Sequence, residues 1–170
     1  MECQSVQQHK SGSDESLGVC VVTISDTRTL ETDVGGSLII ELAEQAGHQV
    51  IRREIIPDEP DAMRALLNEC RQQANVQVVL MTGGTGISNR DQTYETVTAL
   101  FTREIPGYGE LFRFLSFQEI GSACILSRAT AGLINELLVI TMPGSPAAVQ
   151  LAMQQIVIPE LGHLIREATK

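Results

Sequence analysis

The chain has 170 residues, enough for one compact domain, because a single hydrophobic core usually organises about 100 to 200 residues. Hydrophobic residues make up 43% and charged residues 19%, which excludes a disordered chain. Twelve basic against 21 acidic residues give a formal net charge of −9, so the surface should repel polyanions and we expect no nucleic-acid partner. A small phosphorylated ligand is compatible with this charge, since backbone N–H groups bind phosphate without net positive charge.

The N-terminal residues 1–17 are rich in Gln, Ser, Asp and Glu, and we predict that they form a flexible tail before a domain at residues 18–170. The tail lacks the basic start and apolar centre of a signal peptide, and no run of about 18 apolar residues occurs in the chain. We therefore expect a cytoplasmic protein with no membrane partner.

The cysteines are scattered, without a C-x-x-C pair or a histidine at metal-ligand spacing: Cys3, Cys20, Cys70 and Cys124. This spacing favours buried, reduced thiols over a disulfide framework or a zinc site. The three histidines are far apart, and no Ser or Cys stands in a nucleophile elbow, so a hydrolase triad has no support.

From residue 18 onward, short apolar runs alternate with stretches of helical periodicity. Residues 19–24 form a β-branched run that is typical of a strand buried on both faces. Further strands are predicted at 49–56, 76–81, 123–129 and 137–142, and helices at 37–46, 60–73, 91–101 and 109–117. A closing helical region spans 146–168, where Pro159 should cause a break or a kink. The alternation predicts an α/β fold, a three-layer α/β/α sandwich with a mostly parallel sheet.

A glycine-rich loop follows the third predicted strand: Thr82-Gly83-Gly84-Thr85-Gly86. Ligands of open α/β sheets bind outside the carboxyl ends of the strands, and glycines allow several N–H groups to turn toward one anion. Neither the P-loop nor the G-x-G-x-x-G dinucleotide motif is present. The loop predicts a phosphate-binding site, with a tight turn that binds no ligand as the alternative.

Two aspartates should stand beside this loop. Asp91 follows the loop in the sequence, and Asp58 follows the second predicted strand, so both should lie at the same sheet edge. Both are candidate Mg²⁺ ligands, because Mg²⁺ prefers oxygen ligands and is often shared between one or two carboxylates and substrate phosphates. The alternative is that each begins or caps the helix after it. Other polar segments also follow strands: Ser25-Asp26 and Pro143-Gly144-Ser145-Pro146.

Six segments occur in an order that is highly specific, although each alone is weak: Val22-Thr23-Ile24-Ser25-Asp26, Ile56-Pro57-Asp58-Glu59, Thr82-Gly83-Gly84-Thr85-Gly86 with Asp91, Ile105-Pro106-Gly107-Tyr108-Gly109-Glu110, Ile125-Leu126-Ser127-Arg128 and Met142-Pro143-Gly144-Ser145-Pro146. In this order they resemble the molybdenum cofactor biosynthesis family that includes MoaB, MogA and the G domain of gephyrin. The resemblance covers residues 18–164.

The resemblance implies an α/β/α domain that binds molybdopterin and assembles as a homotrimer, or as a dimer of trimers. Members of the MogA type use ATP and Mg²⁺ to adenylylate molybdopterin, with release of pyrophosphate. For this chain it implies catalytic and metal-binding roles for Asp58 and Asp91. It also implies substrate-binding roles for a wider set: Thr82, Gly83, Gly84, Thr85, Gly86, Ser25, Asp26, Arg90, Glu110, Gly144 and Ser145.

Two departures from the MogA type favour a second interpretation. After the glycine loop that type resembles Arg-Arg-Asp-Val-Thr-Pro-Asp, whereas this chain, like the MoaB branch, reads Asn89-Arg90-Asp91-Gln92-Thr93-Tyr94-Glu95. Ala147 stands where many relatives carry Lys. These departures favour a non-catalytic molybdopterin-binding protein as the alternative to an adenylyltransferase. A third hypothesis is a purely structural oligomeric subunit, in which the glycines serve only as turns.

The predicted helix at 109–117 holds more apolar side chains than one buried stripe requires: Leu111, Phe112, Phe114 and Leu115. Because an oligomer needs an exposed apolar patch, we predict that this segment helps to build the subunit interface. The alternative is that it only packs on the sheet.

Overall fold

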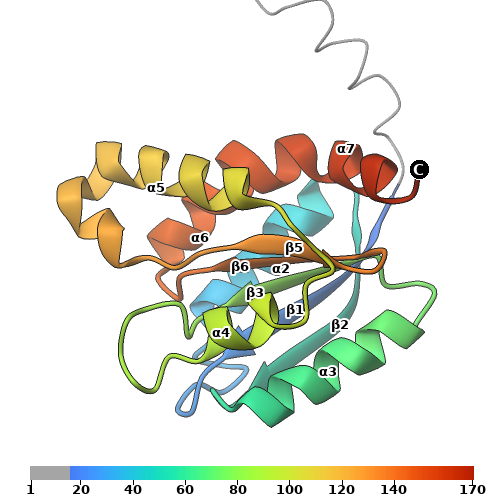
Figure 1. Cartoon of the computed structure of the whole chain (residues 1–170), viewed down its shortest axis with the longest axis horizontal. Coiled ribbons are helices and arrows are strands. Elements are labelled where there is room, and N and C mark those ends of the chain that lie inside the picture. Colours follow the sequence, from blue (N-terminus) through green and yellow to red (C-terminus); the bar gives the residue numbers. More distant parts are fainter. Residues whose placement is uncertain (1–15) are drawn as a thin grey trace, which may run out of the picture.

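Six strands form one sheet in the order β2-β1-β3-β6-β5-β4 in the computed structural model, which describes residues 16–170 (Figure 1). The strands are β1 (Gly18–Ile24), β2 (Gln49–Ile56), β3 (Val78–Thr82), β4 (Arg103–Glu104), β5 (Ala131–Ile134) and β6 (Leu137–Met142). The first three strands and β6 pair in parallel, whereas β5 is antiparallel to both β6 and β4. The predicted α/β fold with a mostly parallel sheet is confirmed.

Helices cover both faces of this sheet (Figure 1). One face carries α3 (Pro60–Gln72) and α4 (Thr93–Thr98), and the other carries α2 (Val34–Gln45), α5 (Pro106–Ile120), α6 (Pro146–Ala152) and α7 (Ile158–Ala168). A 3-10 helix, η1 (Gly121–Leu126), follows α5, and a π-helical segment, η2 (Met153–Val157), joins α6 to α7. The three predicted layers are therefore present.

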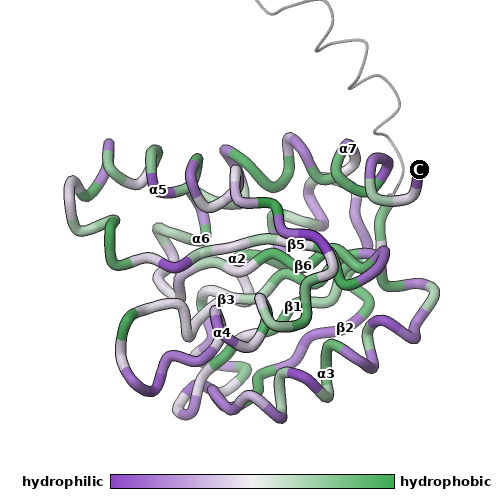
Figure 2. The backbone as a smooth tube through the Cα atoms, viewed as in Figure 1, coloured by the Kyte–Doolittle hydropathy of each residue, from purple (hydrophilic) through white to green (hydrophobic). Residues whose placement is uncertain are grey.

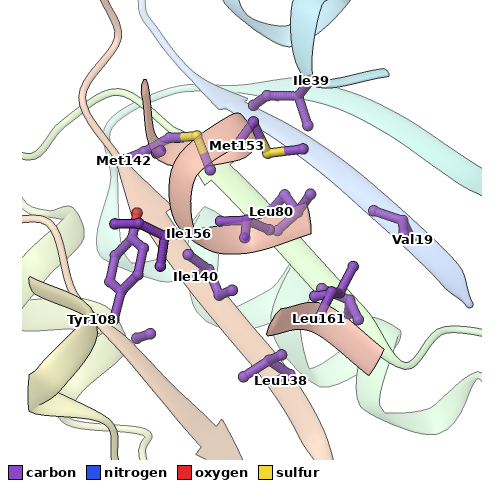
Figure 3. Close-up of a cluster of buried hydrophobic side chains, with 14 of the residues drawn as sticks. Val19, Ile39, Leu80, Tyr108, Leu138, Ile140, Met142, Met153, Ile156 and Leu161 are labelled. Atoms are coloured by element: carbon purple, nitrogen blue, oxygen red, sulfur yellow. The ribbon is translucent and has the colours of Figure 1, made fainter. Parts of the chain in front are cut away.

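Alternate residues of the central strands supply two hydrophobic clusters. Val19 and Val21 of β1 belong to the larger cluster, shown in Figure 3, and Cys20 and Val22 to the smaller one under α3. Every residue of β1 is buried, which explains its unbroken apolar run. Figure 2 shows that hydrophobic and hydrophilic stretches alternate along α3, as expected for a helix with one face on the sheet and the other toward solvent.

The predicted tail, residues 1–17, lies outside the described residues except for its last two. Leu17 is 4% exposed and belongs to the larger core cluster. Ser16 Oγ donates a hydrogen bond of 2.8 Å to the Gly47 carbonyl oxygen. The packed domain therefore includes Ser16 and Leu17.

The strand predicted at 123–129 is wrong. Residues Gly121–Leu126 form η1, and β5 begins only at Ala131. Gly121, at φ 62°, ends α5, and the apolar residues Ile125 and Leu126 after it are 74% and 50% exposed. A short apolar run has no periodicity that separates a strand from a helical turn. The strand β4 was not predicted either, because its two residues, Arg103 and Glu104, are charged and exposed and carry no apolar pattern.

Several helix ends also differ from the prediction. The buried side chain of Asp33 caps α2, which therefore begins at Val34 rather than at residue 37. Pro106 lies in the first turn of α5, before the predicted start at residue 109, and α4 begins at Thr93 rather than at residue 91. Pro159 does not break the closing helical region, because it lies in the first turn of α7 directly after the wider π-helical turn of η2.

Candidate active site

Four loops meet at the carboxyl edge of the parallel strands, after β1, β2, β3 and β6. Hydrogen bonds join them in pairs: Thr82 Oγ1 donates to the Pro143 carbonyl at 3.0 Å, and Asp58 N donates to Asp26 Oδ1 at 3.3 Å. In Figure 1 the loops after β1 and β3 project at the same end of the molecule as the turn between α5 and η1. The strand order thus brings residues from distant parts of the chain to one edge.

The glycine-rich loop can be built only from glycines at two positions. Gly83 and Gly84 have φ angles of 105° and 63°, and a Cβ on Gly84 would lie 2.5 Å from Asp58 Oδ2. The N–H groups of Gly84, Thr85 and Gly86 find no acceptor among residues 16–170, although Thr85 is 4% exposed. A tight turn explains the φ angles, but it does not explain three consecutive N–H groups without acceptors. These groups are available to an anion.

The two aspartates lie against different glycines of this loop. Gly84 lies against the carboxylate of Asp58, and Gly86 lies against that of Asp91, since a Cβ on Gly86 would come 2.9 Å from Asp91 Oδ2. Neither aspartate caps the helix after it: the N-cap residue of α3 is Glu59 and that of α4 is Gln92. The capping alternative is therefore wrong for both.

The carboxylate of Asp58 is held in a buried position. The side chain is 6% exposed, and its Oδ1 accepts a hydrogen bond of 3.1 Å from the Gln92 N–H. Burial raises the pKa of Asp58, and the negative charges of Asp91 and Asp26 act in the same direction. The hydrogen bond from the Gln92 N–H and the positive charge of Arg90 act in the opposite direction and lower the pKa of Asp58. An incoming cation would relieve the repulsion between these carboxylates.

The donor set at the loop fits Mg²⁺. Asp91 Oδ2 accepts from the Ser88 N–H at 2.9 Å, so Asp58 Oδ2 and Asp91 Oδ1 are left without a hydrogen-bond donor among the described residues. No group of three or more His, Cys, Asp or Glu side chains in residues 16–170 could form a cage of protein ligands. Two carboxylate oxygens beside a set of free N–H groups match the preference of Mg²⁺ for a few carboxylates plus substrate phosphates.

The guanidinium of Arg90 is already paired with carboxylates and is not free to bind an anion at the loop. Its Nε and Nη2 donate to the two carboxylate oxygens of Asp26 at 2.8 and 2.9 Å, and its Nη1 donates to Glu59 at 2.6 Å. The Arg90 guanidinium holds the pKa of Asp26 below its usual range. Arg90 thus connects the loops after β1, β2 and β3, and a substrate phosphate would have to compete with two carboxylates for it.

A cavity of about 370 Å³ opens beside the glycine-rich loop. One wall consists of the loop with Asp91 and of Gly144, Ser145 and Ala148. The opposite wall is mostly apolar and comes from α5 and η1: Phe112, Ser116, Ile120, Ala123, Cys124 and Leu126. Sequence reasoning missed this wall. The strand predicted at 123–129 placed Ala123, Cys124 and Leu126 inside the sheet, and the helix predicted at 109–117 was assigned only to a subunit interface or to packing on the sheet.

The remaining predicted residues lie elsewhere. Ser25 and Asp26 line a separate cavity of about 530 Å³ with Arg28 and Arg53. Glu110 is exposed on α5 and lines neither cavity. Thr82 is 1% exposed and donates to Pro143, so its side chain joins two loops. The structure therefore collects the glycine-rich loop, both aspartates, Gly144 and Ser145, and separates Glu110 from them.

Residues 20–163 match the sequence profile of the family described as "Probable molybdopterin binding domain". The chain is 50% identical over 168 residues to molybdenum cofactor biosynthesis protein B of Bacillus subtilis strain 168, covering 98% of each chain. A crystal structure of a molybdenum cofactor biosynthesis protein B aligns with a TM-score of 0.89 at 46% identity, covering 92% of this chain and 98% of the other. The tungsten cofactor synthesizing protein MoaB of Pyrococcus furiosus aligns with a TM-score of 0.83 at 34% identity, covering 92% and 99%.

The α/β fold is thus shared with these proteins. The chain belongs to the molybdopterin-binding domain family that contains them, and the resemblance found in the sequence is confirmed. None of the helices in residues 16–170 has the length and apolarity needed to cross a bilayer.

Proposed function

We propose that the protein is an enzyme of molybdenum cofactor biosynthesis that transfers AMP from ATP to the terminal phosphate of molybdopterin. The observation that carries this proposal is the pair of aspartates that lie against Gly84 and Gly86 of a loop with three free N–H groups. A phosphate oxygen of molybdopterin attacks the α-phosphorus of ATP, a new P–O bond forms, and the bond to the bridging oxygen breaks so that pyrophosphate leaves. This reaction needs no protein nucleophile, and the candidate site contains none in a suitable setting.

The chain's contribution to this reaction is positioning and charge stabilisation. The N–H groups of the glycine-rich loop bind phosphate oxygens, and their dipoles offset the negative charge that develops during transfer. Asp58 and Asp91 would hold Mg²⁺, which would neutralise phosphate charge when bound. The apolar wall of α5 and η1 suits a flat ring system and holds the pterin against the loop.

The second candidate function is molybdopterin binding without turnover. Ala147 leaves the first turn of α6 without a cation beside Gly144 and Ser145, and Arg90 is already paired with Asp26 and Glu59. The absence of a cation at position 147 and the pairing of Arg90 both leave less positive charge for the phosphates of ATP. They do not affect the apolar wall, so a pterin would still bind.

The experiment that separates the two is formation of adenylylated molybdopterin from molybdopterin and ATP, with and without Mg²⁺. We expect Mg²⁺-dependent product, and we expect Asp91→Asn to lower kcat/KM by about 100-fold or more, because metal stabilisation of transition-state charge is worth several kcal/mol. Asp61→Asn on α3 is the matched control, since this side chain is fully exposed and lines neither cavity. Molybdopterin binding without product would favour the binding protein.

We also infer a cytoplasmic homotrimer, or a dimer of trimers, with α5 and η1 at the subunit contact. Several apolar side chains of this region are 44–74% exposed: Leu111, Phe114, Phe117, Ile120, Ile125 and Leu126. We call this set the α5–η1 patch. Phe112 is 1% exposed and Leu115 is half-buried, so both pack on the chain's own sheet instead. Ile120 and Leu126 also line the cavity, so a second subunit on the patch would lie close to the site.

A further inference from the structure

Arg128 lies opposite Asp91, on the short segment between η1 and β5. Its backbone is fixed on both sides: its N–H donates to the Thr85 carbonyl at 3.0 Å, and Arg113 Nη1 donates to the carbonyls of Ser127 and Ala129 at 3.4 and 3.3 Å. These hydrogen bonds fix the backbone at Arg128 and connect it to the glycine-rich loop.

The guanidinium of Arg128 binds both ends of the segment 86–91. Nε donates to the Gly86 carbonyl at 2.7 Å, and Nη2 donates to the Asp91 carbonyl at 2.9 Å. These two nitrogens form one edge of the rigid guanidinium plane, which suits two acceptors at a set separation. The distance between the two ends of the segment is thus set by a planar group rather than by the segment itself.

Two further residues hold the guanidinium in place. Nη1 pairs with the carboxylate of Glu95, and the guanidinium carbon lies 5.5 Å from the centre of the Tyr94 ring. Tyr94 and Glu95 belong to the stretch that departs from the MogA type. The structure assigns these residues a contact with Arg128 and, through it, with the segment that carries Asp91.

Residues 87–89 are exposed, with Ile87 at 67%, and their hydrogen bonds stay within residues 87–92, as in the turn between Ser88 and Asp91. Arg90 is anchored by Asp26 and Glu59, and Arg128 supplies the contact that joins Gly86 to Asp91. We propose that Arg128 is the positioning residue that holds Asp91 in register with Asp58 across the glycine-rich loop. The functional part of this inference rests on the proposed role of Asp91, because Arg128 acts through that residue.

Direct binding of substrate phosphate by Arg128 is the competing interpretation. The geometry opposes it, because each of the three guanidinium nitrogens already donates to a protein oxygen and the side chain is 24% exposed. Arg128 also lines neither the cavity beside the loop nor the cavity around Ser25. Loss of Arg128 should therefore weaken metal binding and turnover more than it weakens substrate binding.

The first test is amide hydrogen exchange of the full chain without any ligand, comparing wild type with Arg128→Met and Arg128→Lys. We expect faster exchange of residues 86–92 in Arg128→Met, unchanged exchange in β1 and β3, and an intermediate effect in Arg128→Lys, because an ammonium cannot span both carbonyls. Arg64→Met on α3, whose partner is the exposed Asp61, is the matched control. Unchanged exchange of residues 86–92 in a folded Arg128→Met would overturn the proposal.

The second test titrates Mn²⁺ alone, as a spectroscopic substitute for Mg²⁺, and then measures turnover. Loss of an outer partner of a metal ligand typically costs about 10–100-fold in metal affinity, and we expect a loss in this range for Arg128→Met with partial recovery in Arg128→Lys. In turnover, kcat should fall and KM for molybdopterin should stay within about twofold. A raised KM with unchanged Mn²⁺ affinity would overturn positioning in favour of substrate contact.

The two proposals fail in different ways. If wild type binds Mn²⁺ but forms no adenylylated product, the adenylyltransferase is wrong, while exchange and Mn²⁺ affinity still decide the role of Arg128. If wild type turns over and Arg128→Met matches it in exchange, Mn²⁺ affinity and kcat, the role of Arg128 is wrong and the enzyme stands. Should Arg128→Met fail to fold, Glu95→Gln removes the charge that holds the guanidinium and must reproduce the faster exchange to a smaller degree.

Discussion

At the scale of single residues, Asp58 combines an unfavourable environment with a central position. Its carboxylate is buried beside Gly84, receives one backbone hydrogen bond and faces the charges of Asp91 and Asp26. A group whose pKa is raised by folding costs the folded state free energy when it ionises. This unfavourable term is what the proposed Mg²⁺ would offset, because a bound cation stabilises the ionised carboxylate.

The cost of the ionised Asp58 carboxylate to the free energy of unfolding can be measured. Because burial raises its pKa, the cost to the folded state is absent below the ordinary carboxyl pKa of about 3.9 and complete once the pH exceeds the raised pKa. Asp58→Asn, which keeps an oxygen for the Gln92 N–H, should therefore increase the free energy of unfolding at neutral pH. The increase should shrink as the pH falls toward about 4, and turnover should fall by about 100-fold or more.

Urea unfolding at several pH values checks this prediction. Asp61→Asn, an exposed site on α3, should show neither the stabilisation nor its pH dependence. A variant that is less stable than wild type at neutral pH would mean that the ionised carboxylate makes a favourable contact that outweighs its burial.

At the scale of elements, the glycine-rich loop is a rigid connection between β3 and α4. Gly84 takes a positive φ of 63°, and its missing side chain makes room for Asp58 on one side and for Thr93, the first residue of α4, on the other. The loop thus sets the distance between the end of the strand, the start of the helix and the carboxylate. Its glycines are required by packing as well as by backbone conformation.

Gly84→Ala should destabilise the fold by at least about 2 kcal/mol. A left-handed conformation costs a non-glycine residue about 1–2 kcal/mol, and the new Cβ, 2.5 Å from Asp58 Oδ2, adds the cost of overpacking. Thermal unfolding measures the effect, and turnover should be lost because Asp58 must move. Gly107→Ala in the first turn of α5 is the control: its Cβ would meet nothing within 4 Å, so we expect no destabilisation.

At the scale of the whole molecule, the helical layer that contains α5 and η1 exposes a group of apolar side chains. The α5–η1 patch exposes six large apolar side chains at one end of the molecule, close to the cavity. Exposed apolar residues grouped in this way are typical of subunit contacts in symmetric oligomers. The net charge of −9 makes such a contact more dependent on apolar burial, since like charges on the subunits repel one another.

If the α5–η1 patch forms the proposed trimer contact, Leu111→Asp and Phe114→Asp should each shift the protein to a monomer. The monomer should stay folded, because these side chains are 44% and 62% exposed. Sedimentation equilibrium gives the mass, and circular dichroism reports the fold. Val34→Asp changes an apolar residue that is 56% exposed on α2, outside the α5–η1 patch, and should leave the mass unchanged. A wild-type monomer, or trimers that survive both α5 substitutions, would place the contact elsewhere.

Local pattern was enough to predict much of this protein from its sequence. Three features are local signals: the apolar run of β1, the apolar stripe of α3 and the polar residues after each strand. Burial on two faces and helical periodicity each produce a pattern that can be recognised within a few residues. Parallel pairing then places the ends of β1, β2, β3 and β6 at one edge, so the neighbourhood of Asp58, Asp91 and the glycine-rich loop followed from the sequence.

The tertiary structure decided what depends on residues far apart in the chain. Arg90 pairs with Asp26 across 64 positions, and Arg128 binds Gly86 across 42 positions, so neither contact leaves a periodic signal in the sequence. The reversal of β5 and the conversion of residues 121–126 into η1 also depend on packing against α5 and β6, which overrides the local preference of a short apolar run. Local burial patterns therefore specified the layers and the loop, whereas long-range pairing specified how the side chains at the active edge are held.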